Sequence, residues 1–103
     1  MVKIVKISKE EASRRLGDVS DEKHFWCHDG KLIKNLGELE KALNDMSDET
    51  FHYHSGEGRN DFSSWVRDVV GDANLANDLS KAKSRTQASK AVAQRVSFLQ
   101  SKI

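Results

Sequence analysis

The sequence predicts a mostly helical α+β fold in which a small β-hairpin packs with four to six helices. Two observations predict it. The pair Asp29-Gly30 separates two short apolar runs, which is the strongest short-range signal for a hairpin. Most of the remaining chain carries apolar residues at helical spacing, and each such segment follows a Ser, Asn or Asp that can cap a helix. A chain of 103 residues is expected to form a single domain, residues 1–103.

The N-terminal part of the chain is basic, and its pattern changes at Ser8. Residues 2–7 form a short β-branched segment, so we expect an additional edge strand or an extended arm there. Ser8 and Glu11 have the spacing of a capping box, which predicts a helix over about residues 9–16. Gly17 is expected to end this helix in the left-handed conformation.

The predicted hairpin starts with residues 24–28, and we expect Asp29-Gly30 to close it as a type I′ turn. Side chains alternate between the two faces of a strand, so one face must meet the core. One face carries Phe25 and Cys27, and the other carries His24, Trp26 and His28.

Further helices are predicted after the hairpin, each with one apolar face. Their expected caps are Asn35, Ser47, Asn60 or Asp61, and Asp72, and Gly71 is expected to end the helix that precedes Asp72. The apolar faces predict a core that includes Leu36, Leu39, Leu43, Met46, Phe62, Trp65, Val66, Val69, Val70, Leu75, Ala76 and Leu79. The body of the domain is therefore expected over about residues 8–80.

The last segment, about residues 84–103, is predicted as one long basic helix. Its apolar stripe consists of Ala88, Val92, Val96, Leu99 and Ile103. A helix of this length spans about 30 Å, the width of a small domain. It is expected to pack on the core, to pair with a second copy of the chain, or to project from the body.

Charge is distributed unevenly along the chain, although the formal net charge is only +1. Residues 17–75 are acidic, whereas both ends are basic. Basic ends suit a nucleic-acid partner, through weak binding without sequence preference, or they pack against the acidic body of the same molecule. The candidate contacts to nucleic acid are Lys3, Lys6, Lys81, Lys83, Arg85, Lys90 and Arg95.

Composition excludes several classes of protein. The chain has no apolar run near the roughly 20 residues of a membrane span, so no membrane partner is expected. Acidic residues occupy the region where a signal peptide needs its apolar core, and a single cysteine excludes an intramolecular disulfide. We therefore expect a cytoplasmic protein, and no motif in the sequence indicates a cofactor.

The densest group of aromatic and hydrogen-bonding residues comprises Tyr53, His54, Asn60, Asp61 and Trp65. In one interpretation the group is structural: a polar side chain caps a helix while a buried histidine bonds to that turn and packs on the tryptophan. In the other, the same residues lie beside the glycine-containing loop 55–59 and form a small pocket for a ligand. We favour the structural interpretation.

A metal or thiol site is the remaining chemical alternative. His24, Cys27, His28, His52 and His54 are residue types that bind zinc, and Cys27 with a histidine and Asp61 could form a nucleophilic set. Adjacent residues in a strand, such as Cys27 and His28, point to opposite faces, however. Side chains that are two residues apart on a helix, such as those of His52 and His54, point in different directions. We therefore assign no metal ligand and no catalytic residue.

The order of motifs over residues 22–79 resembles a known family. An aromatic strand precedes the segment Leu36-Gly37-Glu38-Leu39, and the segments that follow are Phe51-His52-Tyr53-His54, Asn60-Asp61-Phe62 with Trp65, and Gly71 with Leu75-Ala76. This pattern is similar to that of small archaeal and bacterial domains catalogued as a domain of unknown function. The resemblance implies a compact cytoplasmic domain of archaeal or bacterial origin, and it brings no established activity. The basic helix after residue 80 lies outside the resemblance.

The functional expectation is a non-enzymatic interaction module whose partner is another protein or a second copy bound through the C-terminal helix. A nucleic-acid binder that uses both basic ends is the first alternative, and a metal or thiol site is the second. The nucleic-acid alternative needs basic side chains that are exposed on the surface. The metal or thiol alternative needs histidine nitrogens without partners in the fold.

Overall fold

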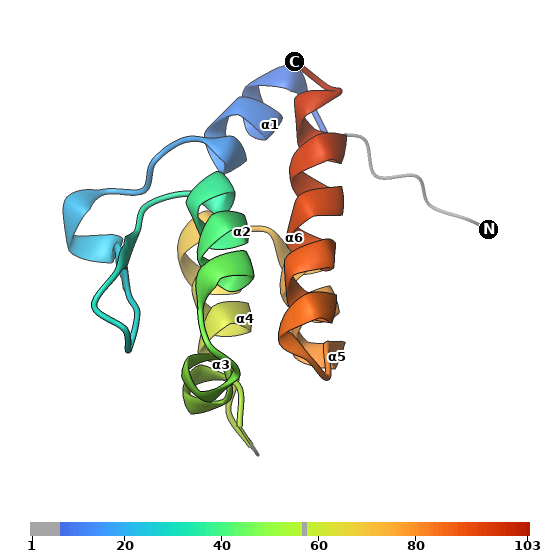
Figure 1. Cartoon of the computed structure of the whole chain (residues 1–103). Coiled ribbons are helices and arrows are strands. Elements are labelled where there is room, and N and C mark those ends of the chain that lie inside the picture. Colours follow the sequence, from blue (N-terminus) through green and yellow to red (C-terminus); the bar gives the residue numbers. More distant parts are fainter. Residues whose placement is uncertain (1–6, 57) are drawn as a thin grey trace.

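The computed structural model describes residues 7–56 and 58–103 of the chain (Figure 1). Their architecture is α+β and mostly helical, with one two-stranded hairpin, so the predicted fold class is confirmed. In chain order the elements are α1 (Lys9–Leu16), a 3₁₀ turn (Asp21–Lys23), β1 (Phe25–Trp26), β2 (Leu32–Ile33), α2 (Leu36–Asp45), α3 (Asp48–His54), α4 (Asp61–Trp65), a π-helical turn (Val66–Val70), α5 (Ala73–Lys81) and α6 (Arg85–Gln100).

The hairpin pairs its strands antiparallel, with Phe25 opposite Ile33 and Trp26 opposite Leu32. The predicted type I′ turn is wrong, because that turn needs two residues with positive φ and only Gly30 has one, at 90°. Gly30 N–H instead bonds to Cys27 O, and Cys27 N–H bonds to Lys31 O, both at 2.9 Å. The loop therefore contains three residues and ends on a left-handed glycine. The expected N-terminal strand over residues 2–7 falls almost wholly outside the described residues.

Helix α1 begins as predicted and ends differently. Ser8 Oγ accepts the Glu11 N–H at 3.1 Å, but the Glu11 carboxylate bonds to Arg14 and Arg15 rather than completing a capping box. The expectation of a left-handed Gly17 is wrong, since its φ is −77° and its ψ is 171°. The chain leaves the helix extended, and Val19 N–H then bonds to Lys34 O at 2.8 Å beside the hairpin.

The downstream helices begin at the predicted caps. Side-chain oxygens of Asn35, Ser47, Asn60 and Asp72 each accept a backbone N–H in the first turn of the helix that follows, and Ser84, which is not among the predicted caps, does the same for α6. Gly71 takes the left-handed conformation, with φ of 83°, and ends the π-helical turn as expected.

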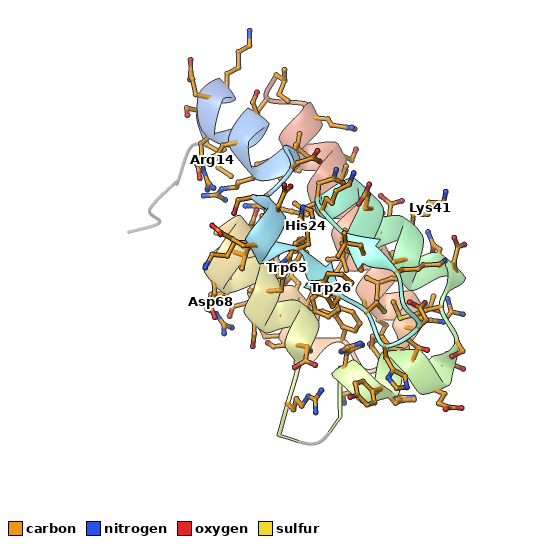
Figure 2. All side chains as sticks on the ribbon, turned by 90° about the vertical axis from the view of Figure 1, so that its left-hand side faces the viewer. Arg14, His24, Trp26, Lys41, Trp65 and Asp68 are labelled. Atoms are coloured by element: carbon orange, nitrogen blue, oxygen red, sulfur yellow. The ribbon has the colours of Figure 1, made fainter. Side chains whose placement is uncertain are left out.

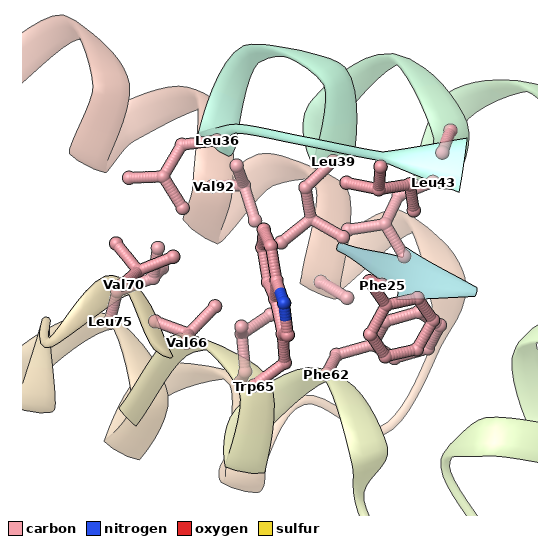
Figure 3. Packing of buried hydrophobic residues seen from close by; sticks show 14 of the residues in the cluster. Phe25, Leu36, Leu39, Leu43, Phe62, Trp65, Val66, Val70, Leu75 and Val92 are labelled. Atoms are coloured by element: carbon pink, nitrogen blue, oxygen red, sulfur yellow. The ribbon is translucent and has the colours of Figure 1, made fainter. Parts of the chain in front are cut away.

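Trp65 lies at the centre of the core. Figure 3 shows its indole rising from α4 towards Leu36 and Leu39 of α2. The stacked rings of Phe25 and Phe62 lie on one side of the indole. The hairpin thus buries its Phe25 and Cys27 face, and the opposite face with Trp26 points outward.

The C-terminal helix packs on its own body, the first of the three expected arrangements. Helix α6 lies along α2 and also contacts α1 and α5 (Figure 1). Ala88, Val92 and Leu99 are buried as predicted. The expectation that Ile103 extends the stripe is wrong, because the helix ends at Gln100 and Ile103 is 57% exposed. No helix in the described part of the chain is long and apolar enough to cross a bilayer.

Candidate functional site

Four of the five residues predicted to cluster come together around the start of α4. The expected packing of His54 on Trp65 is wrong, because the His54 ring packs on Phe25 and Phe62 instead. The His54 and Asp61 side chains are in contact, and Asn60 caps the helix that carries Trp65. The Tyr53 and His54 rings pack edge to face with centroids 5.0 Å apart. The group therefore joins α3 to α4 across the loop between them.

The buried imidazole of His54 uses both of its ring nitrogens within the fold. Nε2 accepts the backbone N–H of His28 at 2.9 Å, and Nδ1 lies 2.9 Å from Oδ2 of Asp61. Because a backbone N–H can only donate, Nε2 carries no proton, and Nδ1–H donates to Asp61. In this arrangement neither nitrogen is free to accept a proton from a substrate or to bind a metal ion.

The other polar members of the cluster also serve the fold. Asn60 Oδ1 accepts the Ser63 N–H at 3.0 Å, and its Nδ2 donates to Leu79 O at 2.9 Å. Trp65 Nε1 donates to Lys23 O at 2.8 Å, which ties the core to the 3₁₀ turn. Of the five predicted cluster residues, Tyr53 is the one with a half-exposed side chain.

Asp61 is held by charge as well as by hydrogen bonding. The Arg59 guanidinium donates to Asp61 Oδ2 at 2.8 Å, and this interaction lowers the pKa of the Asp61 carboxyl. Partial burial opposes the shift, and the hydrogen bond from His54 adds to it. The His54 ring is therefore anchored on an ionised carboxylate that is itself anchored by an arginine.

Cys27 lies in the core under the hairpin and is 6% exposed. Burial raises the pKa of its thiol above the ordinary value, which disfavours the nucleophilic thiolate. Within residues 7–56 and 58–103, no three His, Cys, Asp or Glu side chains lie close enough together to hold a metal ion. His24 has one acidic neighbour, with its Nε2 3.7 Å from Asp21 Oδ1.

An open pocket of about 740 Å³ lies beside this cluster, and residues of α3, the loop before α4, the π-helical turn and the end of α5 line it. Its floor includes Phe51 and Ser63, and its rim includes His52 of α3. We call it the cationic pocket because Arg59, Arg67 and Lys83 also line it. Its size is in the range of sites for small molecules.

The charged side chains that the structure describes in the lining of the cationic pocket are Arg59, Arg67 and Lys83. Among the described lining residues, none carries a carboxylate. Arg59 is bound to Asp61 behind the rim, whereas among the described residues Arg67 makes one long contact, 3.4 Å from its Nη2 to Ser63 Oγ. Lys83 is exposed in the link between α5 and α6. The pocket thus offers nitrogen donors of the kind that bind anions.

No family model, no curated protein and no solved structure matches this chain. The resemblance to the archaeal and bacterial family therefore stays a prediction. The function has to be inferred from the geometry of the chain itself.

Exposed aromatic side chains lie next to the cationic pocket. The His28 and Tyr53 rings stack with centroids 3.9 Å apart and an interplanar angle of 14°. The Arg59 guanidinium lies 5.2 Å from the centroid of the Tyr53 ring. On the same outer side of the hairpin, Trp26 is 73% exposed, and Figure 2 shows it on the face turned towards the viewer.

The predicted nucleic-acid contacts fall into three groups. Lys81, Lys83 and Lys90 are exposed, and Lys3 and Lys6 lie outside the described residues. Arg85 is directed inward: its Nη1 donates to Leu43 O at 2.8 Å and to Asn44 O at 3.0 Å, at the C-terminal end of α2. Helix ends leave such carbonyls without partners, so Arg85 caps α2.

Arg95 is also directed inward. Its Nε donates to Asp72 Oδ2 at 2.8 Å, and its side chain is 13% exposed. Arg85 and Arg95 therefore hold the C-terminal helix on its own body, as the alternative interpretation of the basic ends expected.

Sequence reasoning missed Arg59 and Arg67 as candidate binding residues. They belong to the acidic middle of the chain, so a count of charge by segment hides them. They meet Lys83 only because the loop, the π-helical turn and the end of α5 converge in space. No local pattern in the sequence carries that information.

Proposed function

We propose that this chain is a non-enzymatic binding module for a polyanionic partner and that the cationic pocket is its binding site. The observation that carries the proposal is the convergence of Arg59, Arg67 and Lys83 on one pocket from three separate segments. Guanidinium and ammonium groups bind phosphate through charge-assisted hydrogen bonds, and arginine does so with a planar pair of donors.

The absence of a reactive group at the cluster supports binding rather than catalysis. His54, the buried histidine beside the pocket, has both nitrogens engaged, and the Cys27 thiol is buried with a raised pKa. A general base needs a free lone pair, and a thiol nucleophile needs access and a low pKa. Neither condition is met among the described residues of this region.

A cytoplasmic location belongs to this proposal. The sequence contains one cysteine, and a small domain with one buried thiol suits a reducing compartment. Prokaryotic origin rests on the family resemblance alone.

The test compares two doubly substituted chains that lose the same charge in different places. Arg67→Gln with Lys83→Gln removes two cations from the pocket. Lys41→Gln with Lys90→Gln removes two exposed cations outside it. Arg59 is left in place because it also anchors Asp61.

Binding is measured by isothermal titration calorimetry with inorganic polyphosphate at about 50 mM salt, where electrostatic binding is strong. The wild type and the control should bind alike, and the pocket variant should bind at least about 10-fold more weakly, with a shallower dependence on salt. Equal binding by both variants, or no binding by the wild type, contradicts the proposal.

A further inference from the structure

The cationic pocket continues into a run of exposed rings. We call Trp26, His28 and Tyr53 the aromatic run. Trp26 is exposed on β1, and His28 follows two residues later in the hairpin loop. The His28 ring stacks on Tyr53, and Arg59 lies over Tyr53 and lines the pocket. The His28, Tyr53 and Arg59 side chains thus connect the hairpin loop to the pocket, and the exposed Trp26 lies two residues before this contact.

We infer that the polyanion is a single-stranded nucleic acid, whose bases stack on the aromatic run while its phosphates lie in the cationic pocket. The inference rests on the proposed function and adds the chemical class of the partner. Proteins that bind single strands combine a cationic groove with exposed aromatic rings, because every base has a face that can stack.

The exposure of Trp26 indicates that its ring is available to stack on a base rather than to pack in the core. Its indole is 73% exposed, whereas Trp65, the other tryptophan, is 7% exposed and bonded to Lys23 O. A duplex hides the faces of its bases within the stack, so a ring on a convex hairpin can reach only the bases of a single strand. The aromatic run therefore selects single-stranded over double-stranded partners.

Among the residues that the structure describes, the carboxylates of Asp29 and Asp61 lie close to this surface and have partners within the fold. Asp29 Oδ1 accepts the Lys31 N–H at 3.0 Å in the hairpin loop. Asp61 is paired with Arg59 and His54. Their charge lowers the affinity for a polyanion, which favours weak binding without sequence preference over tight recognition.

The competing occupant is a protein that covers Trp26 and its cross-strand neighbour Leu32, which is 39% exposed. Such a partner needs the apolar hairpin face and does not need the cationic pocket. The presence of both features on one surface favours the nucleic acid, and the test below separates the two.

The experiment measures fluorescence anisotropy of labelled oligonucleotides of about 15 nucleotides, the size that such sites cover. Oligo(dT), oligo(U), an abasic strand of the same length and a duplex are titrated with the intact protein at low salt. Oligo(dT) or oligo(U) should bind at least about 5-fold more tightly than the abasic strand, since base stacking adds affinity to the phosphate contacts.

Trp26→Ala should weaken oligo(dT) binding about 5-fold or more and leave the abasic strand and polyphosphate unchanged. Trp26→Phe should restore most of the loss, because it keeps a ring. Phe98→Ala is the matched control, an exposed ring on α6 that lies outside the aromatic run, and it should bind like the wild type.

Three results would overturn the inference. Equal affinity for oligo(dT) and the abasic strand would show that base stacking does not contribute to binding, and it would leave the polyanion proposal intact. An unchanged affinity in Trp26→Ala shows that the hairpin face is free for a protein partner instead. Failure of every strand and of polyphosphate to bind removes both proposals together.

Discussion

Arg95 of α6 donates a 2.8 Å hydrogen bond from its Nε to Oδ2 of Asp72, a carboxylate with 0% exposure. Asp72 also accepts the Leu75 N–H through Oδ1, and Arg15 Nη1 lies 3.2 Å from its Oδ2. One buried carboxylate therefore caps α5 and joins it to α1 and α6. A residue that sequence reasoning assigned to nucleic acid is part of the internal structure.

Arg95→Ala is expected to lower the free energy of unfolding by about 3–5 kcal/mol, the usual cost of removing one partner of a buried ion pair. Asp72 would then keep the hydrogen bond from the Leu75 N–H and one longer charged contact, to Arg15. Lys90→Ala, on an exposed position of the same helix, should change stability by less than about 0.5 kcal/mol. Urea denaturation of both variants checks this, and equal stabilities would show that the ion pair contributes nothing.

The same carboxylate makes stability depend on pH. Burial alone would raise the pKa of Asp72, but hydrogen bonds from Arg95 and the Leu75 amide, with the charges of Arg95 and Arg15, outweigh burial and lower it. Below pH about 4 the unfolded chain binds a proton at this group that the folded chain does not bind. The stabilisation is therefore present above that pH and is lost as pH falls through the lowered native pKa.

Asp72→Asn is expected to be less stable than the wild type at pH 7 and to lose less stability on acidification. Some dependence on pH remains, because the pKa of Glu11 is lowered to about 2 by its bonds to Arg14 and Arg15, and that of Asp61 is lowered too. Urea denaturation from neutral pH to about pH 2.5 gives the slope of the free energy of unfolding against pH for the variant and for the wild type. Parallel slopes for the variant and the wild type would rule out the shift at Asp72.

The two tryptophans should respond in opposite ways to the same substitution. Trp65→Ala removes a core indole and its hydrogen bond to Lys23 O, so we expect a loss of about 3–5 kcal/mol. Trp26→Ala removes an exposed ring and should cost less than about 0.5 kcal/mol. Thermal and urea unfolding of the pair test the placement, and a wild-type melting temperature for Trp65→Ala contradicts it.

Most of the helices could be predicted because their signals are local. Asn35 caps a helix that buries Leu36, Leu39 and Leu43, and every residue needed for that prediction lies within one short segment. Arg85 and Arg95 could not be placed in this way. Their partners Leu43 and Asp72 are 42 and 23 residues away, so their direction depends on how α6 packs.

The candidate site was predicted in part for the same reason. The pairing of His54 with the start of α4 follows from residues close in sequence, and the structure brings Tyr53, His54, Asn60 and Asp61 together. The backbone N–H of His28, which donates to Nε2 of His54, lies in the hairpin loop 26 residues away. That bond depends on the three-residue loop, which sequence reasoning assigned to another turn type.

His54→Ala provides the direct test of that bridge. It leaves the His28 N–H and the Asp61 carboxylate without their shared partner and opens space beside Phe25 and Phe62, whose rings pack on the imidazole. We expect a loss of about 2–4 kcal/mol, from unpaired polar groups and lost packing together. His52→Ala, at an exposed position on the same helix, should cost less than about 0.5 kcal/mol.

A second measurement on the wild type separates the bridge from packing alone. Nitrogen NMR chemical shifts of the His54 ring should report a proton on Nδ1 and none on Nε2, because Nε2 accepts a backbone N–H. A ring with its proton on Nε2 could not accept that bond, and it would have a lone pair on Nδ1 facing an acceptor oxygen of Asp61. That result would contradict the closed bridge and reopen His54 as a group available for chemistry.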